Sequence, residues 1–204
     1  KNNKIDYDCN PDTVLEEATR RKMSPKMLCA FKDGTKTMVE MTAMSNYTGL
    51  VPDVIGGHGP KTSPGTEGIK EMNEILKLKK DGGILNKHGV VEYINGIAPG
   101  VFVTVSTPNA EIAYQLGYHS MGPGPLWTLY RPYHLCNLET PLSVARAVIE
   151  GDATCVAKNG LVSECITRAK IDLKAGQTID GIGGFTTHGS IATAEESNAN
   201  GYVP

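Results

Sequence analysis

Residues 126–151 read LWTLYRPYHLCNLETPLSVARAVIEG, and they predict a strand that is followed by a helix. The run Leu126–Arg131 has the apolar and aromatic content that is typical of strands. A helix is predicted to begin at Thr140-Pro141, because a threonine cap followed by a proline suits the first helical turn. Gly151 is the expected end of that helix. The succession of strand and helix favours an α/β architecture.

The same alternation is found on the N-terminal side of this stretch. Residues 56–68 are rich in Gly, Pro and Ser, which predicts a loop. Residues 35–46 fit a strand after an Asp-Gly hairpin turn, but the helical spacing of their apolar residues favours a helix. Further strands are predicted at residues 26–31, 90–94 and 101–106, and further helices at residues 11–22, 67–81 and 108–118. Strands interleaved with helices predict an α/β fold (α+β, with a mixed sheet against helices).

The pattern changes after about Thr154. From Lys158 onward the chain shows short β runs and turn signals without a helical period, and the segment AEESNAN (residues 194–200) reads as a polar loop. These features predict a small all-β module. We therefore expect one larger domain at residues 1–157 and a separate module at residues 158–204.

Composition narrows the classes of function. The hydrophobic content of 40%, the charged content of 21% and the net charge of −2 are ordinary for a globular protein and give no basic footprint for nucleic acid. No apolar run has the length of a membrane span, and no signal peptide opens the chain. The five cysteines are scattered without metal-ligand spacing, which predicts reduced thiols in a cytoplasmic protein. Both ends read as cuts through a longer polypeptide.

Four segments together resemble one family, and they are FKDGTKTMVEMTAMSNYTGL, NGIAPGVFVTV, PLWTLYRPYHLCNLETPLSVARAVIEGDA and AKIDLKAGQTIDGIGG. They resemble the homoserine-dehydrogenase-like oxidoreductases that carry a C-terminal SAF domain, a group that includes the deoxyxylulose-phosphate-reductoisomerase-like enzymes. The resemblance implies a homodimer that acts on a small hydroxylated or phosphorylated metabolite. It also implies that residues 1–157 are the catalytic, substrate-binding and dimerisation domain, and that residues 158–204 are part of the SAF (β-clip-like) domain.

In that family a Rossmann domain precedes the part that is seen here. This sequence has no Gly-x-Gly-x-x-Gly turn after a strand. The resemblance therefore implies that NAD(P) is bound mainly by a domain absent from this chain, and that the chain alone is inactive.

Residues 131–139, RPYHLCNLE, contain the side chains that alcohol–carbonyl redox chemistry requires. Such chemistry needs a proton carrier, donors to the substrate oxygen and anchors for the substrate. Arg131 would bind an anion, and Tyr133 would donate a hydrogen bond from its hydroxyl. His134 would carry the proton, and the Glu139 carboxylate would orient the group that carries it. The same residues also fit a structural network in which Arg131 pairs with Glu139. The family resemblance favours the functional interpretation.

A second group of candidates lies on the helix predicted at residues 35–46. Lys36 and Glu40 are four residues apart and share a helix face, so Lys36 would supply a proton or hold a phosphate beside the counter-charge of Glu40. An exposed ion pair of little energetic value is the alternative. Asn46 would either cap the helix end or contact a substrate hydroxyl.

The third candidate is His58, in the glycine-rich loop IGGHGPKTSPG. Its neighbours allow the close backbone approach of a ligand-binding loop, although a mobile, exposed histidine fits the sequence as well. His58, His134 and Glu139 are chemically a possible metal set. Their spacing gives it no support, and no metal is predicted.

Two functions without catalysis fit the same sequence. One is a cofactor-free module whose SAF-like end binds a sugar or an acid. The other is a purely structural dimerisation scaffold. The scaffold predicts that Tyr133, His134 and Glu139 are buried against a partner chain with no cavity beside them.

Overall fold

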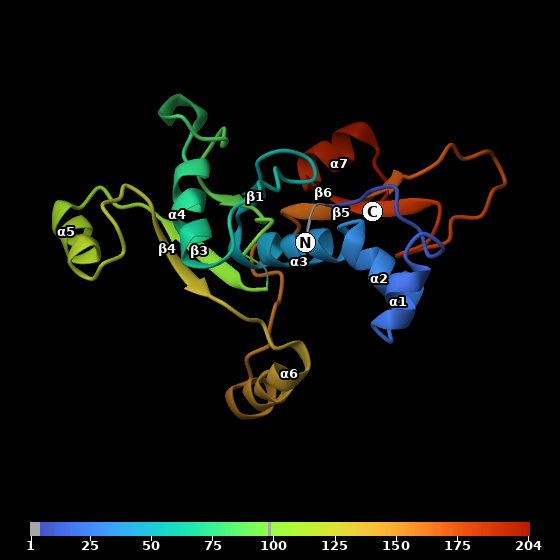
Figure 1. The fold of residues 1–204 in the computed structure, drawn as a ribbon, viewed down its shortest axis with the longest axis horizontal. Helices are drawn as coiled ribbons and strands as arrows, with labels where there is room; N and C mark the ends of the chain where they lie inside the picture. The colour runs from blue at the N-terminus through green and yellow to red at the C-terminus, as the bar shows by residue number, and fades with distance from the viewer. Residues whose placement is uncertain (1–4, 98) are drawn as a thin grey trace. The chain divides into compact units, whose positions relative to one another are not determined.

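The computed structural model describes residues 5–97 and 99–204, and these residues form helices and small sheets (Figure 1). The chain folds into two compact units, and it passes between them more than once. Unit 1 combines the residues up to His58 with Gly89–Tyr93 and Cys155–Pro204, and unit 2 combines Gly59–His88 with Ile94–Thr154.

Among the described residues, unit 1 contains four helices and two strand pairs, and they come from both ends of the chain. Its elements are α1 (Leu15–Arg20), α2 (Pro25–Lys32), α3 (Thr35–Thr48), β1 (Val51–Pro52), β2 (Val90–Val91), β5 (Ser163–Ala169), β6 (Thr187–Thr193) and α7 (Ala194–Asn200). Strands β5 and β6 pair antiparallel from Ser163↔Thr193 to Ala169↔Thr187, whereas β1 and β2 pair parallel.

The core of unit 1 forms where α3 packs on β5 and β6. Met38 and Met41 on α3 are buried against Val91 and Ile191, as their spacing on one helix face requires. A second apolar cluster joins the N-terminal segment to α1 and α2, and it consists of Cys9, Val14, Ala18, Leu28 and Cys29. The first cluster fixes α3 to the strands of unit 1, and the second packs α1 and α2 against the N-terminal segment.

The turn between α2 and α3 depends on two residues. The Asp33 carboxylate accepts the Thr35 N–H at 2.9 Å, which satisfies one donor of the first turn of α3. Gly34 has φ +80°, and a Cβ on it would lie 2.6 Å from Ile5 Cδ1. Only glycine therefore fits this turn without displacing Ile5.

Unit 2 is built around the antiparallel pair β3 and β4, whose register runs from Val101↔Arg131 to Val105↔Trp127. A Thr104–Thr128 hydroxyl pair at 2.8 Å links the strands, and the Tyr130 hydroxyl donates to the Ile97 carbonyl at 2.6 Å. The elements of unit 2 are α4 (Gly65–Ile75), the 3-10 turn η1 (Lys79–Asp81), β3 (Val101–Val105), α5 (Ala110–Tyr118), β4 (Trp127–Arg131), α6 (Cys136–Ala145) and the π-helical turn η2 (Arg146–Glu150).

Much of the predicted order of elements is confirmed. Helices occupy the predicted positions in α3, α4 and α5, and strands do so in β2, β3 and β4. The helix predicted from residue 11 begins only at Leu15, because the Asn10 side chain accepts the N–H groups of Asp12 and Thr13 in a preceding turn. The fold is mixed α/β, but each sheet in the described residues has two strands.

Three predicted elements are wrong. Residues 26–31 lie in helix α2, which begins at Pro25, and not in a strand. Pro141 lies inside α6, which starts five residues earlier at Cys136, so Thr140-Pro141 is not the helix start. The segment AEESNAN is helix α7, begun by a capping box in which Thr193 and Glu196 bond each other's backbone N–H groups. Residues 158–204 therefore contain a helix as well as the strands β5 and β6.

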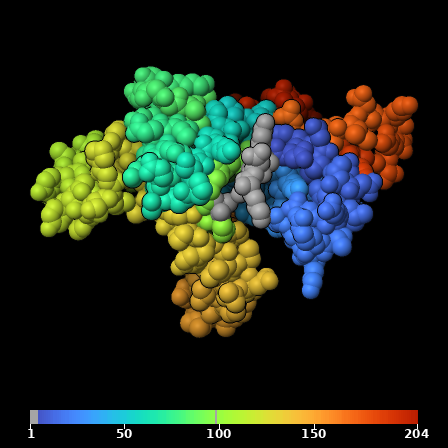
Figure 2. Space-filling view, in the orientation of Figure 1, coloured from blue at the N-terminus to red at the C-terminus, as the bar shows by residue number. Residues whose placement is uncertain are grey.

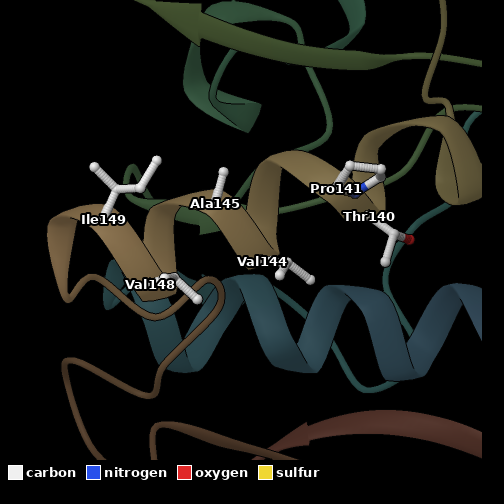
Figure 3. Close-up of a pocket in the computed structure, with 6 residues that line it drawn as sticks. All are labelled: Thr140, Pro141, Val144, Ala145, Val148 and Ile149. Atoms are coloured by element: carbon white, nitrogen blue, oxygen red, sulfur yellow. The ribbon is translucent and has the colours of Figure 1, made fainter.

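One surface of unit 2 is apolar and open. The group of gold and orange atoms at the bottom of Figure 2 includes α6 and η2, whose large apolar side chains are exposed. Figure 3 shows the side chains that line a shallow hollow along this helix, and they are Thr140, Pro141, Val144, Ala145, Val148 and Ile149. Among the residues that the model describes, no helix combines the length and the apolar character required to cross a bilayer.

Candidate active site

Two acidic residues follow the two parallel strands of unit 1. Strands β1 and β2 pair through Val51↔Val90 and Pro52↔Val91, and the next residues along the chain are Asp53 and Glu92. The carboxyl ends of parallel strands lie at one edge of a sheet, which is where α/β proteins place their ligands. The Asp53 side chain is fully buried, and Glu92 is 9% exposed. This edge therefore holds two carboxyl groups away from bulk water.

His58 joins these carboxyl groups. Its Nε2 lies 2.7 Å from Asp53 Oδ2, and its side chain is 19% exposed. The His58 backbone N–H donates to Glu92 Oε2 at 2.9 Å, while Glu92 Oε1 accepts the Tyr93 N–H at 2.9 Å. Asp53 thus orients the imidazole ring, and Glu92 fixes the backbone that carries it.

The glycines before His58 allow this close packing. Gly56 has φ +81°, and its N–H donates to the Ile191 carbonyl of β6 at 2.8 Å. Gly57 has φ +69°, and a Cβ on it would lie 2.8 Å from Glu92 Oε1 and 3.0 Å from a Tyr93 ring carbon. A side chain at Gly57 would therefore push Glu92 away from the His58 backbone.

Aromatic groups of the same unit remain neutral. Burial, together with Tyr7 and the charge of Glu92, raises the pKa of Tyr93 well above that of a free phenol. Burial also lowers the pKa of His188, whose ring lies 4.6 Å from the ring of Tyr7. These residues offer neutral hydrogen-bonding groups at neutral pH.

The Asp53–His58 pair is suited to general acid–base chemistry. With Asp53 ionised, this contact requires a proton on Nε2, which leaves Nδ1 as the nitrogen that can accept a proton. A carboxylate on the far nitrogen also stabilises the imidazolium that forms when Nδ1 takes a proton. Among the described residues, no group of three or more His, Cys, Asp and Glu side chains is arranged to hold a metal ion.

The structure brings together three of the four candidates at residues 131–139. Arg131 forms an ion pair with Glu139, and its guanidinium lies 4.5 Å from the centroid of the Tyr133 ring. Glu139 also accepts the Leu135 N–H at 3.1 Å. The bond to Arg131 lowers the pKa of Glu139, and the same bond raises the pKa of Arg131. His134 instead places Nδ1 3.4 Å from Cys136 Sγ.

The candidates on α3 are not grouped. Lys36 Nζ lies 4.2 Å from the centroid of the Phe31 ring, and Glu40 is exposed on the helix surface. Asn46 uses its side-chain amide to hold the start of β5, because Oδ1 accepts the Val162 and Ser163 N–H groups at 2.8 and 2.9 Å. The roles assigned from sequence to Lys36, Glu40, Arg131, Tyr133, His134 and Glu139 stay predictions.

Sequence analysis identified His58 but missed its two acidic partners. The signal was present in LVPDV and VVEY, where a single acid follows Val51-Pro52 in one case and Val90-Val91 in the other, and valine has a high β propensity. An acid in such a position has to be solvated, paired or used for chemistry. What the sequence does not reveal is that residues 39 apart lie side by side across the strands β1 and β2.

The family model described as "Oxidoreductase DRL, catalytic domain" matches residues 1–140. No curated protein matches the chain.

Proposed function

We propose that this chain, which belongs to the family of oxidoreductase DRL catalytic domains, supplies the acid–base and substrate-binding residues of an NAD(P)-dependent oxidoreductase. Its substrate would be a small hydroxylated or phosphorylated metabolite. The observation that carries the proposal is the Asp53–His58 pair, which lies beyond the carboxyl ends of two parallel strands with Glu92 beside it.

The contribution of these residues is to move a proton. As a substrate alcohol becomes a carbonyl, His58 Nδ1 takes the hydroxyl proton while Asp53 accepts the Nε2–H bond. In the reverse direction the imidazolium returns the proton to the carbonyl oxygen. Glu92 is a positioning residue, because it contacts the backbone of His58 and not the imidazole.

The loop between β1 and α4 does not have the form of a dinucleotide-binding turn. The glycine-rich loop after β1 runs from residue 53 to residue 64 before α4 begins at Gly65. A dinucleotide is held by a much tighter turn that leads from a strand directly into a helix. We therefore propose that NAD(P) is bound mainly by a domain outside these 204 residues, and that the chain alone is inactive.

Three further proposals come from the family resemblance. Arg131 would bind a phosphate or carboxylate of the substrate, for which its planar guanidinium is suited. Residues 158–204 would form part of a SAF-type module. A homodimer is supported by the exposed apolar side chains of α6 and η2, since large apolar patches are typical of interfaces.

The function is tested with the complete enzyme by following NAD(P)H absorbance with a panel of polyols, polyol phosphates and hydroxy acids. We expect His58→Ala to reduce kcat by roughly 10²- to 10⁴-fold, the usual contribution of a general acid or base. Asp53→Asn should reduce kcat with little change in KM. His88→Ala is the matched control, because His88 is an exposed histidine.

Two outcomes would contradict the proposal. Full activity in His58→Ala would remove His58 as the proton carrier, and the variants His134→Ala and Lys36→Ala would then test the residues predicted from sequence. A complete enzyme that binds a sugar or an acid, but oxidises or reduces none of the panel, would favour the binding module instead.

A further inference from the structure

A buried lysine joins three segments of unit 1. Lys170 donates to Asp33 Oδ2 at 2.7 Å, to the Cys9 carbonyl at 2.8 Å and to the Gly184 carbonyl at 3.1 Å. The Lys170 side chain is 2% exposed and that of Asp33 is fully buried. The ammonium group is therefore held in place by three oxygen acceptors.

Two cysteines face each other beside this lysine. The Sγ atoms of Cys9 and Cys29 are 3.5 Å apart, and both residues are buried, at 2% and 0% exposure. Cys29 Sγ donates to the Cys9 carbonyl at 3.3 Å and lies 3.4 Å from Lys170 Nζ. The other cysteines, Cys136, Cys155 and Cys165, are exposed or half-buried and lie elsewhere in the chain.

We propose that Cys9 and Cys29 form a reversible disulfide when the protein meets a peroxide. A disulfide requires the sulfurs to be about 2.05 Å apart. The Sγ atoms at 3.5 Å would therefore have to approach by about 1.5 Å, which side-chain rotation together with a small backbone shift would supply. The bond would join residues 20 apart in sequence, and so would fasten the N-terminal segment to α2.

The reaction is balanced with hydrogen peroxide as the oxidant. The Cys29 thiolate attacks one peroxide oxygen, which gives a sulfenic acid and hydroxide, and the hydroxide takes up the proton that Cys29 released. The Cys9 thiol then attacks the sulfenic sulfur, and the S–S bond forms as water leaves. Two thiols and one peroxide thus become one disulfide and two waters.

The surroundings favour Cys29 as the first nucleophile. The Lys170 ammonium faces Cys29 Sγ and stabilises the negative charge that develops there. Burial and the hydrogen bond to Cys29 raise the pKa of the Cys9 thiol to about 12, so Cys9 is the weaker nucleophile and serves as the resolving thiol. Asp33 and Lys170 are the charged groups that face the pair.

A small oxidant reaches the pair through the N-terminal segment. Residues 5–14 form no helix or strand, and the neighbours Tyr7 and Asp8 are exposed. The segment is held by a backbone bond from the Asp6 N–H to the Lys32 carbonyl at 2.8 Å and by the bonds that Lys170 and Cys29 donate to the Cys9 carbonyl, so access requires local opening of these contacts. Local opening of such a segment is far less costly than unfolding of the unit.

The test is peptide mapping of the full chain after treatment with hydrogen peroxide, alkylation of the remaining thiols and digestion with trypsin under non-reducing conditions. Cys9 and Cys29 fall in separate tryptic peptides, residues 5–20 and residues 27–32. We expect these peptides to be recovered as one linked species that dithiothreitol separates. The variant Cys136→Ser/Cys155→Ser/Cys165→Ser should give the same link, because it retains only the buried pair.

A second measurement does not depend on recovery of peptides. The closed loop should raise the Tm of the oxidised protein by roughly 6 °C or more, and dithiothreitol should reverse the shift. Cys9→Ser should abolish both the link and the shift, and if this variant fails to fold, Cys9→Ala takes its place.

Three outcomes would overturn the proposal. They are full alkylation of both peptides after peroxide treatment, recovery of Cys29 as an unlinked sulfinic acid, and a cross-link from residues 27–32 to the peptide that carries Lys170.

Discussion

Replacement of Lys170 by methionine should strongly destabilise the protein, because it removes the ammonium group that pairs with the buried Asp33 carboxylate. Methionine fills most of the volume but provides no donor. Asp33 would keep its bond from the Thr35 N–H and lose the ammonium at 2.7 Å. The carbonyls of Cys9 and Gly184 would lose their lysine donor as well.

The magnitude follows from the burial of both groups. Breaking a buried ion pair by removing one partner costs roughly 3–5 kcal/mol, since the other charge is left in a poorly solvating environment. Burial alone would lower the pKa of Lys170, but the bond and charge of Asp33 outweigh burial and raise it. A raised lysine pKa means that the stabilisation is complete below the unfolded pKa of about 10.4 and is lost at higher pH. A measurement at neutral pH therefore captures all of it.

The assay is urea unfolding at pH 7 of the wild type, Lys170→Met and the control Lys174→Met, whose lysine is exposed. With an m value of about 2 kcal/mol/M, the midpoint of Lys170→Met should fall by about 2 M, while the control stays within about 0.3 M. The double variant Asp33→Asn/Lys170→Met should recover at least about 1 kcal/mol, because it no longer buries an unpaired charge. A midpoint for Lys170→Met equal to that of the control would refute the reasoning.

Three further predictions concern single positions. Gly57→Ala should destabilise the protein by about 1–3 kcal/mol and reduce turnover of the complete enzyme, because the new Cβ meets Glu92. Gly65→Ala is the control, since Gly65 has a similar φ of +73° and open space around it. Equal turnover in the two variants would contradict the prediction. Hydrogen bonds from the Thr186 hydroxyl and from the Phe185 and Thr186 N–H groups outweigh burial and lower the pKa of Asp180 to about 2. The stabilisation from Asp180 is therefore present above its unfolded pKa of 3.8 and is lost as the pH falls through 2. Asp180→Asn should cost about 1–2 kcal/mol of unfolding free energy at pH 5 and less at pH 2, and a cost that is independent of pH would be inconsistent with this. Thr193→Ala should cost about 1 kcal/mol of unfolding free energy by removing the capping box of α7, whereas Thr193→Ser should retain stability. Thermal unfolding followed by circular dichroism measures both variants, and equal midpoints would argue against the cap.

Sequence patterns predicted the elements whose signals are local. Helix α3 was recognisable because Met38 and Met41 recur at helical spacing, and these residues are buried on one face. The run KMLCAF was misassigned, because a six-residue apolar run has no periodicity that separates a strand from a helix. The Ser24-Pro25 start of α2 was the missed signal, as Thr193 with Glu196 was for α7.

The candidate site could be predicted only in part, because its geometry arises from contacts between distant segments. The placement of Asp53 beside Glu92 depends on the pairing of β1 with β2, and no local pattern encodes that pairing. The same is true of Lys170 and Asp33, which are 137 residues apart. By contrast, the Arg131–Glu139 pair lies within eight residues, and sequence analysis named it as the structural alternative for that segment.

The discontinuous course of the chain has a consequence for how the family diversifies. The chain leaves unit 1 twice to form unit 2. It leaves after His58 and returns at Gly89, and it leaves again after Tyr93 and returns at Cys155. Insertions or deletions within residues 59–88 and 94–154 can therefore accumulate without shifting the strand register that sets Asp53 against Glu92. Differences in length among family members should therefore occur in residues 59–88 and 94–154, whereas the segments that carry Asp53, His58 and Glu92 should tolerate almost no change in length.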